Sequence, residues 1–181
     1  YKESGFLPEW ASPGHRDCMV GNNSASVVAD AYIKGLRGYD IETLWEALKH
    51  GANAHLRGTA SGRLGYESYN QLGYVANNIG IGQNVARTLE YAYNDWAIYT
   101  LGKKLGKPES EIDIYKKHAL NYKSVYHPER KLMVGKDNKG VFNPNFDAVD
   151  WSGEFCEGNS WHWSFCVFHD PQGLINLMGG K

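Results

Sequence analysis

The stretch QNVARTLEYAYNDWAIYTLGKKL, residues 83–105, decides the fold class because it carries the longest helical periodicity in the sequence. Its apolar side chains recur at the three- and four-residue spacing of one helix face. The pattern stops at Gly106-Lys107-Pro108, where proline cannot continue a helix. We therefore predict one long helix over 83–105. Its apolar positions are Val85, Leu89, Ala92, Trp96, Tyr99 and Leu101.

Shorter helical patterns lie on both sides of this stretch. Upstream, we predict helices over 25–36, 41–50 and 66–73, the first capped within 22–24 and the second capped by Asp40. Downstream, Pro108 opens a helix that runs towards Tyr126, and another over 161–168 is capped by Asn159 or Ser160. Two short apolar runs around the turn 135–140 predict a small β-hairpin near 131–142. Because no strands alternate with the helices, the sequence predicts a mainly all-α fold.

Composition and charge restrict the classes of partner. The 181 residues include 19 basic and 20 acidic side chains, which give a net charge of −1 without a basic cluster. We therefore expect neither a nucleic acid nor a membrane as partner. Six Trp, twelve Tyr and six Phe suit the wall of a sugar-binding cleft, although aromatic side chains also fill cores.

The segment 147–170 concentrates acidic and aromatic residues. Glycoside hydrolysis needs one carboxylic acid that protonates the leaving oxygen and a second carboxylate opposite to it. Glu157, between Phe155 and Trp161 on a glycine-containing loop, suits the first role. The alternative is a solvated loop acid that is stabilised near a helix N-terminus.

Other polar residues allow structural as well as functional interpretations. Asp95 is placed to accept a hydrogen bond from a buried hydroxyl or indole, as a core residue does. Arg16 and Arg63 suit contacts with sugar hydroxyls, or pairing with a surface acid. A transition-metal site is disfavoured because paired C-x-x-C spacing is absent and bulky aromatic residues lie between its candidate ligands. These candidates are Cys156, His162, Cys166 and His169.

Several blocks of sequence resemble glycoside hydrolase family 92, the calcium-dependent exo-acting α-mannosidases that invert anomeric configuration. They occur in the family's order over nearly the whole chain. The blocks are FLPEW (6–10), VADAYIKG (28–35), LGYV (72–75), RTLEYAYNDW (87–96), EGNSW (157–161), VFHD (167–170), GLI (173–175) and MGG (178–180).

The resemblance implies that residues 1–181 are part of an (α/α)6-barrel catalytic domain, truncated at both ends. A β-sandwich domain upstream and the remainder of the barrel would be its partners within the parent chain. The acid of the family's E-G-N-x-W block is Glu157 here. The implied substrate is a mannose-containing glycan, and we take Trp161, Arg16, His169 and Asp170 as candidate residues that bind it. Calcium is the implied cofactor, and no ligand for it is assigned.

The sequence departs from the family pattern in a few places. His162-Trp163 replaces the usual Gln-Tyr, and Phe168 replaces the usual proline. The W-D-x-x-R block of the sugar subsite is absent, and so is the downstream G-N-D-D-like segment that holds the general base. We therefore expect the base to lie outside these residues.

Two alternatives to an α-mannosidase stay open at this stage. One is an inverting hydrolase of the same barrel type with another sugar specificity, and the other is a non-catalytic carbohydrate-binding helical domain. An open cleft with an aromatic wall at Glu157 would favour the enzymes. Enzymes of the family are exported as a rule, so the resemblance implies a periplasmic or secreted protein whose signal lies upstream.

The isolated segment 1–181 is expected to be inactive and to self-associate. It supplies one of the two carboxylates of an inverting site, and a partial barrel leaves apolar helix faces uncovered. The test measures mannose release and oligomeric state with calcium present, beside the full-length enzyme. Turnover by a monomer would contradict this expectation and make Asp147, Asp150 or Asp170 the first candidates for the base.

Overall fold

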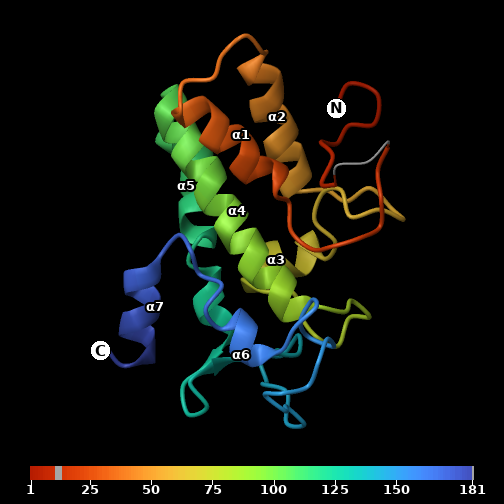
Figure 1. Cartoon of the computed structure of the whole chain (residues 1–181), viewed down its shortest axis with the longest axis vertical. Coiled ribbons are helices and arrows are strands. Elements are labelled where there is room, and N and C mark those ends of the chain that lie inside the picture. Colours follow the sequence, from red (N-terminus) through yellow and green to blue (C-terminus); the bar gives the residue numbers. More distant parts are fainter. Residues whose placement is uncertain (11–13, 181) are drawn as a thin grey trace.

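One long helix, α4, runs through the molecule, and the other elements pack around it (Figure 1). The computed structural model describes residues 1–10 and 14–180. The fold is mainly helical with one small antiparallel sheet, as predicted. The elements are α1 (Ser24–Ile33), α2 (Ile41–Ala52), α3 (Tyr66–Leu72), α4 (Asn84–Leu105), α5 (Glu109–His118), the 3-10 helix η1 (Asn121–Val125), β1 (Tyr126–His127), β2 (Leu132–Met133), α6 (Ser160–Trp163) and α7 (Pro171–Met178).

The helix starts show which side chains satisfy the free backbone N–H groups. The predicted cap of α2 is confirmed, because Asp40 Oδ1 accepts a hydrogen bond from Thr43 N at 3.0 Å. Helix α1 is different: Asn23 occupies the cap position without a side-chain cap bond. The carboxylate of Glu9 accepts from the backbone N of Ser24 at 3.0 Å and from its hydroxyl at 2.9 Å. A distant loop residue therefore caps this helix.

Three predicted helices end earlier than the sequence pattern indicated, and the one predicted over 25–36 ends at Ile33. The helix after Pro108 ends at His118 and the chain continues as η1. The helix predicted over 161–168 ends at Trp163, and a separate helix, α7, follows. Asp170 caps α7 by accepting from Gly173 N at 2.9 Å, and Pro171 is its first residue. This cap and proline are an ordinary helix-start signal that the sequence analysis left unused.

The small hairpin lies earlier in the chain than predicted. Strand β1 pairs with β2 in the register Tyr126↔Met133, and the expected pairing across 135–140 is reduced to the single bridge Lys136↔Phe142. Tyr126 and Met133 are buried in this arrangement, whereas Val141 is 59% exposed. Pairing with β1 thus places buried apolar side chains opposite one another.

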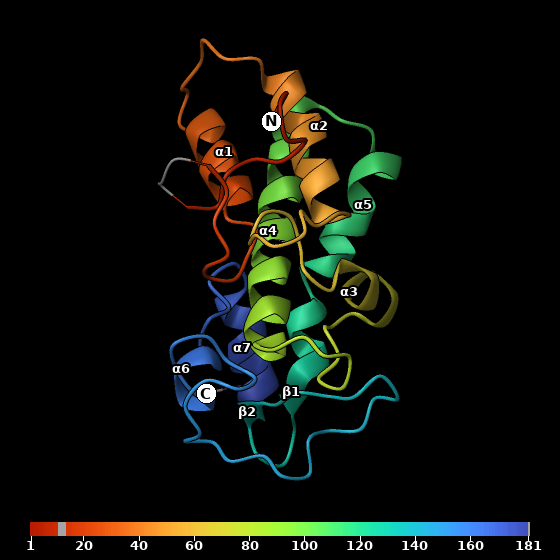
Figure 2. The ribbon, with the colours of Figure 1, turned by 90° about the vertical axis from the view of Figure 1, so that its right-hand side faces the viewer.

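Helix α4 contributes to the two largest apolar clusters, one at each of its ends. Near its start, Val85 and Leu89 pack with residues of η1, β2 and α7. Near its end, Ile98 and Leu101 pack with α1, α2 and α5 (Figure 2). Gly102 permits the close approach there, because a Cβ would lie 2.6 Å from Ile112 Cγ2 and 2.8 Å from Trp45.

A buried ion pair lies between the two clusters. Arg63 Nη1 is 2.8 Å from Asp95 Oδ1, and neither side chain has more than 1% of its surface exposed. Asp95 Oδ2 accepts from the hydroxyl of Tyr69 at 2.9 Å, and His118 Nδ1 is 3.7 Å from the same oxygen. The prediction that Asp95 belongs to a core network is confirmed. Arg63 pairs with an acid too, but in the interior and not at the surface.

Apolar side chains remain exposed along one face of α1 and α4. Trp96, predicted on the apolar face of α4, is 39% exposed and borders a hollow of about 370 Å³ together with Val27, Ile33 and Tyr93. Among the residues that the structure describes, no helix has both the length and the apolar character that crossing a membrane requires.

Replacing Asp95 with asparagine should destabilise the fold strongly. The variant leaves the guanidinium of Arg63 buried without its counter-charge, which costs about 3–5 kcal/mol. Denaturant-induced unfolding of the protein that carries this chain measures the effect. Asp113→Asn on the exposed side of α5 is the control, with an expected change below about 0.5 kcal/mol. Equal unfolding midpoints for the two variants would contradict the prediction.

Candidate active site

Three carboxyl groups and two indole rings line one cavity of about 400 Å³. Glu9 and Trp10 come from the N-terminal loop, and Glu90 comes from α4. Glu157 comes from the loop before α6, and Trp163 is the last residue of that helix. The side chain of Glu157 is exposed, and Trp10 is 50% exposed. The cavity is therefore open to solvent, with both acidic and aromatic walls.

The loop that carries Glu157 is closed on itself by backbone hydrogen bonds. Ser152 N donates to Gly158 O at 2.8 Å, and the side chain of Asn159 caps α6 by accepting from Trp161 N at 3.1 Å. Glu157 itself has a φ of 47°, in the left-handed backbone region that residues other than glycine rarely adopt. Such strain concentrates at functional sites, where the surrounding structure imposes it.

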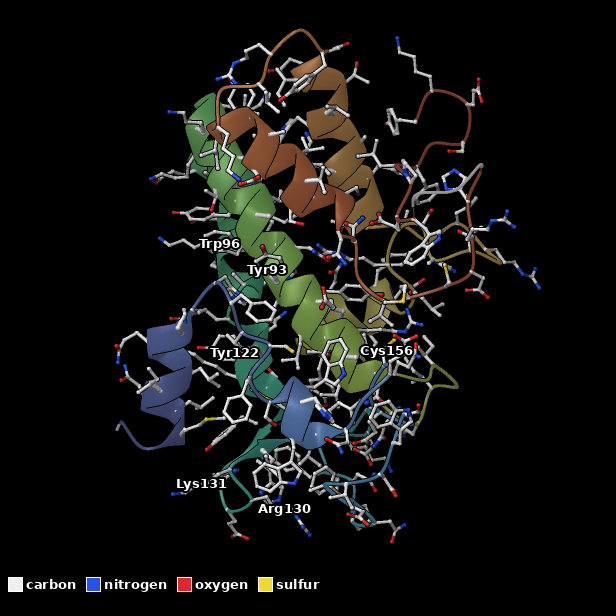
Figure 3. The ribbon with its side chains drawn as sticks, viewed as in Figure 1. Tyr93, Trp96, Tyr122, Arg130, Lys131 and Cys156 are labelled. Atoms are coloured by element: carbon white, nitrogen blue, oxygen red, sulfur yellow. The ribbon has the colours of Figure 1, made fainter. Side chains whose placement is uncertain are left out.

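The start of α4 anchors the same loop. The backbone N–H groups of Val85 and Ala86, which have no partner within the helix, donate to Glu154 O at 3.0 and 3.2 Å. Gln83 N donates to Gly153 O at 2.8 Å. Figure 3 shows Cys156 beside this part of α4. The helix N-terminus therefore sets the position of the loop from which Glu157 projects.

Glu154 is a structural acid in spite of its place beside Glu157. Its carboxylate accepts hydrogen bonds from Gly135 N at 2.9 Å and from the amides of Asn77 and Asn143, both at 3.2 Å. These bonds join three loops around the start of α4. Because its oxygens are occupied in this way, Glu154 holds the loop while Glu157 remains accessible.

Two serines and one indole fix α6 next to the cavity. Ser160 Oγ donates to Met133 O at 2.7 Å, and Met133 N donates to Ser164 Oγ at 2.8 Å, so α6 is bound to β2. Trp163 Nε1 donates to Cys156 O at 2.9 Å. These contacts place the ring of Trp163, and not that of Trp161, on the cavity wall.

Glu90 and Glu9 are the two cavity acids that the sequence analysis did not single out. Burial raises the pKa of Glu90 to about 7, and a hydrogen bond from Asn23 opposes that shift. Burial also raises the pKa of Glu9, against hydrogen bonds from Ser24 and Asn22. Both acids lie within the quoted blocks FLPEW and RTLEYAYNDW, which is the signal that could have found them.

The thiols of Cys156, which lines the cavity, and of Cys166, which does not, are poor candidates for a nucleophile. Burial raises the pKa of the Cys156 thiol, and it raises that of Cys166 to about 11. Both thiols are therefore protonated near neutral pH. Within residues 1–10 and 14–180, no three or more His, Cys, Asp or Glu side chains gather in a way that would hold a metal ion. Calcium is also bound by backbone carbonyls, amide oxygens and water, so this observation neither supports nor opposes the expected calcium site.

The four residues predicted to bind substrate are not among the residues that line this cavity. Trp161 is 54% exposed and outside the lining. The ring of His169 donates from Nε2 to Ala119 O at 2.7 Å and packs against Tyr122. Asp170 accepts from the Tyr122 hydroxyl at 2.8 Å. Arg16 is also not among the lining residues, and its carbonyl accepts from Ala60 N at 2.7 Å.

The three aspartates considered as alternative bases are also not among the residues that line the cavity. Asp147 and Asp150 border a separate hollow of about 340 Å³. Asp170 caps α7, as described above. The carboxyl groups that share a cavity with Glu157 are therefore Glu9 and Glu90.

Comparison with known proteins connects this arrangement to one family. The family model of the glycosyl hydrolase family 92 catalytic domain matches residues 1–181. An inverting family 92 mannosidase of Bacteroides thetaiotaomicron is 49% identical, with a TM-score of 0.94 over 99% of this chain and 24% of that chain. A family 92 α-mannosidase from the same organism is 36% identical, with a TM-score of 0.81 over 90% of this chain and 21% of that chain.

A curated relative from Arthroderma benhamiae is named an uncharacterized secreted glycosidase. It is 29% identical over 214 residues, which cover 100% of this chain and 27% of the relative. The chain thus spans about a quarter of the length of the relatives it matches.

The stability contribution of Glu90 should depend on pH in a defined direction. Because its pKa is about 7 in the fold and about 4.5 in the unfolded chain, ionisation of Glu90 disfavours folding as the pH rises between these values. The unfolding free energy of Glu90→Gln minus that of the parent should therefore rise by about 2–3 kcal/mol between pH 4 and pH 8. Thermal unfolding of the full-length protein at both pH values measures this.

A matched control is Glu129→Gln in the exposed turn between β1 and β2. Its difference from the parent should be the same at both pH values. A Glu90→Gln variant that behaved in the same way would show that the cavity does not perturb this carboxyl.

Proposed function

The chain belongs to glycosyl hydrolase family 92, and from that membership we propose that it supplies the general acid of an exo-acting, inverting α-mannosidase. The substrate is a glycan with terminal α-linked mannose. One observation carries the proposal: Glu157 lines an open cavity with Trp10 and Trp163 in its walls. The left-handed φ of Glu157 on this loop is a further feature that supports an enzyme site over a non-catalytic helical domain.

In this proposal Glu157 protonates the glycosidic oxygen as the bond to the anomeric carbon breaks. The role needs a carboxyl that is accessible to the leaving group and held in place by the protein. Its exposure meets the first condition. The bonds from α4 to Gly153 and Glu154 meet the second, because they fix the loop without occupying the Glu157 side chain.

The lining of the cavity suits a neutral sugar. Indole rings offer flat apolar surfaces to the C–H faces of a sugar, and carboxyl groups bind hydroxyls. Among the described residues that line the cavity there is no lysine or arginine, while three carboxyl groups are present. A sugar that carries a phosphate or carboxylate would meet repulsion there.

Inversion requires a second carboxylate that activates water on the opposite face of the sugar. Asp147, Asp150 and Asp170 are not among the residues that line the Glu157 cavity, which supports a base outside this chain. We therefore place the general base in a part of the relatives' length that this chain does not span. We also place the β-sandwich domain and the remaining barrel helices in that part.

Calcium and location are further parts of the proposal. Calcium is expected from the family. The described residues include no group of three or more His, Cys, Asp or Glu side chains that would hold it. Secretion is supported by the name of the Arthroderma benhamiae relative, a secreted glycosidase.

Replacing Glu157 with glutamine in the full-length enzyme should separate two kinds of substrate. Turnover of unactivated mannosides should fall by about 100-fold or more, because the leaving oxygen then receives no proton from the enzyme. Mannosyl fluoride and nitrophenyl mannoside should be cleaved at nearly the parent rate, since these leaving groups need little protonation. Steady-state kinetics on both classes measure the ratio.

Glu129→Gln is the control and should leave both rates unchanged. Equal losses on both substrate classes would rule out Glu157 as the acid. Assay of a sugar panel, with the anomeric form of the first product followed by NMR, separates an inverting α-mannosidase from a hydrolase of another specificity.

A further inference from the structure

We propose that Glu90 is a second sugar-binding carboxyl of the Glu157 cavity, and that it accepts or donates a hydrogen bond at one hydroxyl of the terminal sugar. The proposal rests on the function proposed above, which makes this cavity a sugar site. Its basis is the placement of Glu90 on α4, where it lines the cavity together with Glu157 and both indoles.

The backbone around Glu90 makes room for its carboxyl at the cavity wall. Gly21, in the loop that faces α4, has a φ of +102°. A Cβ at Gly21 would lie 3.1 Å from Glu90 Oε2 and 2.7 Å from Asn23 Nδ2. A residue with a side chain at this position would therefore displace the carboxyl from the place it occupies.

A network of asparagines orients the partner of Glu90. Asn94 Nδ2 donates to Asn23 Oδ1 at 2.9 Å, and Asn22 N donates to Asn94 Oδ1 at 2.7 Å. The oxygen of Asn23 is thereby occupied, so its amide N–H₂ group faces Glu90 and donates to it. Asn23 is thus a partner that the protein supplies to the Glu90 carboxyl at the cavity wall.

No cation in the described part of the chain forms an ion pair with Glu90. Arg87, one turn earlier on α4, donates instead to Gly82 O at 3.0 Å and to Gln83 Oε1 at 3.4 Å. The neighbouring groups at the cavity are the acids Glu9 and Glu157 and the thiol of Cys156. A partly buried carboxyl without a counter-charge destabilises the fold, and such groups gather at binding sites.

The proposed role differs from that of Glu157. Glu157 acts on the leaving oxygen, so the fall in kcat/KM when it is replaced is expected to depend on the leaving group. Glu90 would hold the sugar through a hydroxyl, so the fall in kcat/KM when it is replaced should be the same for good and poor leaving groups. Near neutral pH the carboxyl of Glu90 is present in both protonation states, which lets it donate or accept.

The test pairs a variant of Glu90 with substrates that each lack one hydroxyl. The full-length protein is assayed on nitrophenyl α-mannoside and on its 2-, 3-, 4- and 6-deoxy analogues. Glu90→Ala should lower kcat/KM on the parent sugar by about 10- to 100-fold, as expected for loss of a hydrogen bond to a carboxylate. On the one analogue that lacks the contacted hydroxyl, the same variant should cause almost no further loss.

A purely structural role for Glu90 gives a different pattern. In that case Glu90→Ala lowers kcat/KM by one common factor on the parent sugar and on all four analogues, and the proposal is overturned. Unchanged kinetics on every substrate would also overturn it. Glu129→Ala is the control, and Glu90→Gln is the second variant if Glu90→Ala does not fold, because it keeps the volume and an oxygen for Asn23.

Failure of the proposed function can be told apart from failure of this proposal. If another sugar is cleaved, the α-mannosidase assignment is wrong, and the same deoxy series made on that sugar tests Glu90. If no glycoside is cleaved, calorimetric titration with mannose and its deoxy forms gives the same comparison. Equal affinities of the parent and the Glu90→Ala variant for every sugar would then overturn the proposal.

Discussion

The ion pair between Arg63 and Asp95 is the interaction on which the arrangement of helices depends. Both groups are fully buried, so neither can exchange its partner for water. Asp95 lies on α4, Arg63 precedes α3, and the Tyr69 hydroxyl from α3 donates to the same carboxylate. His118, at the end of α5, lies 3.7 Å away. One carboxylate thus fixes α3 and the segment before it against α4.

Helix α4 connects the Arg63–Asp95 ion pair to the candidate active site. Its N-terminal N–H groups hold the loop at Gly153 and Glu154, from which Glu157 projects. Glu90 lies on the same helix, a little more than one turn before Asp95. Because the helix is rigid along its length, the ion pair, Glu90 and the Glu157 loop keep fixed relative positions. A distant change that shifts α4 is therefore expected to disturb the site.

Four glutamates near the site show how environment gives one side chain different tasks. Glu154 has its oxygens occupied by three donors, and Glu9 caps α1 through Ser24 while also lining the cavity. Glu90 is partly buried without a cation partner, and burial raises its pKa to about 7. Glu157 is exposed on a strained loop. Glu157 is thus the accessible acid, and Glu90 has Asn23 as its partner at the cavity wall.

The sequence by itself determined the mainly helical fold, the long helix α4, the cap at Asp40 and the family. These features follow from local spacing and from short blocks, which a chain carries in its order of residues. It did not determine that β1 pairs with β2, since two apolar runs compete for one partner. It also gave no reason to prefer Trp163 to Trp161. Tertiary structure decided those points, and it placed Glu90 beside Glu157, because residues far apart in sequence meet at a cavity only when the helices pack.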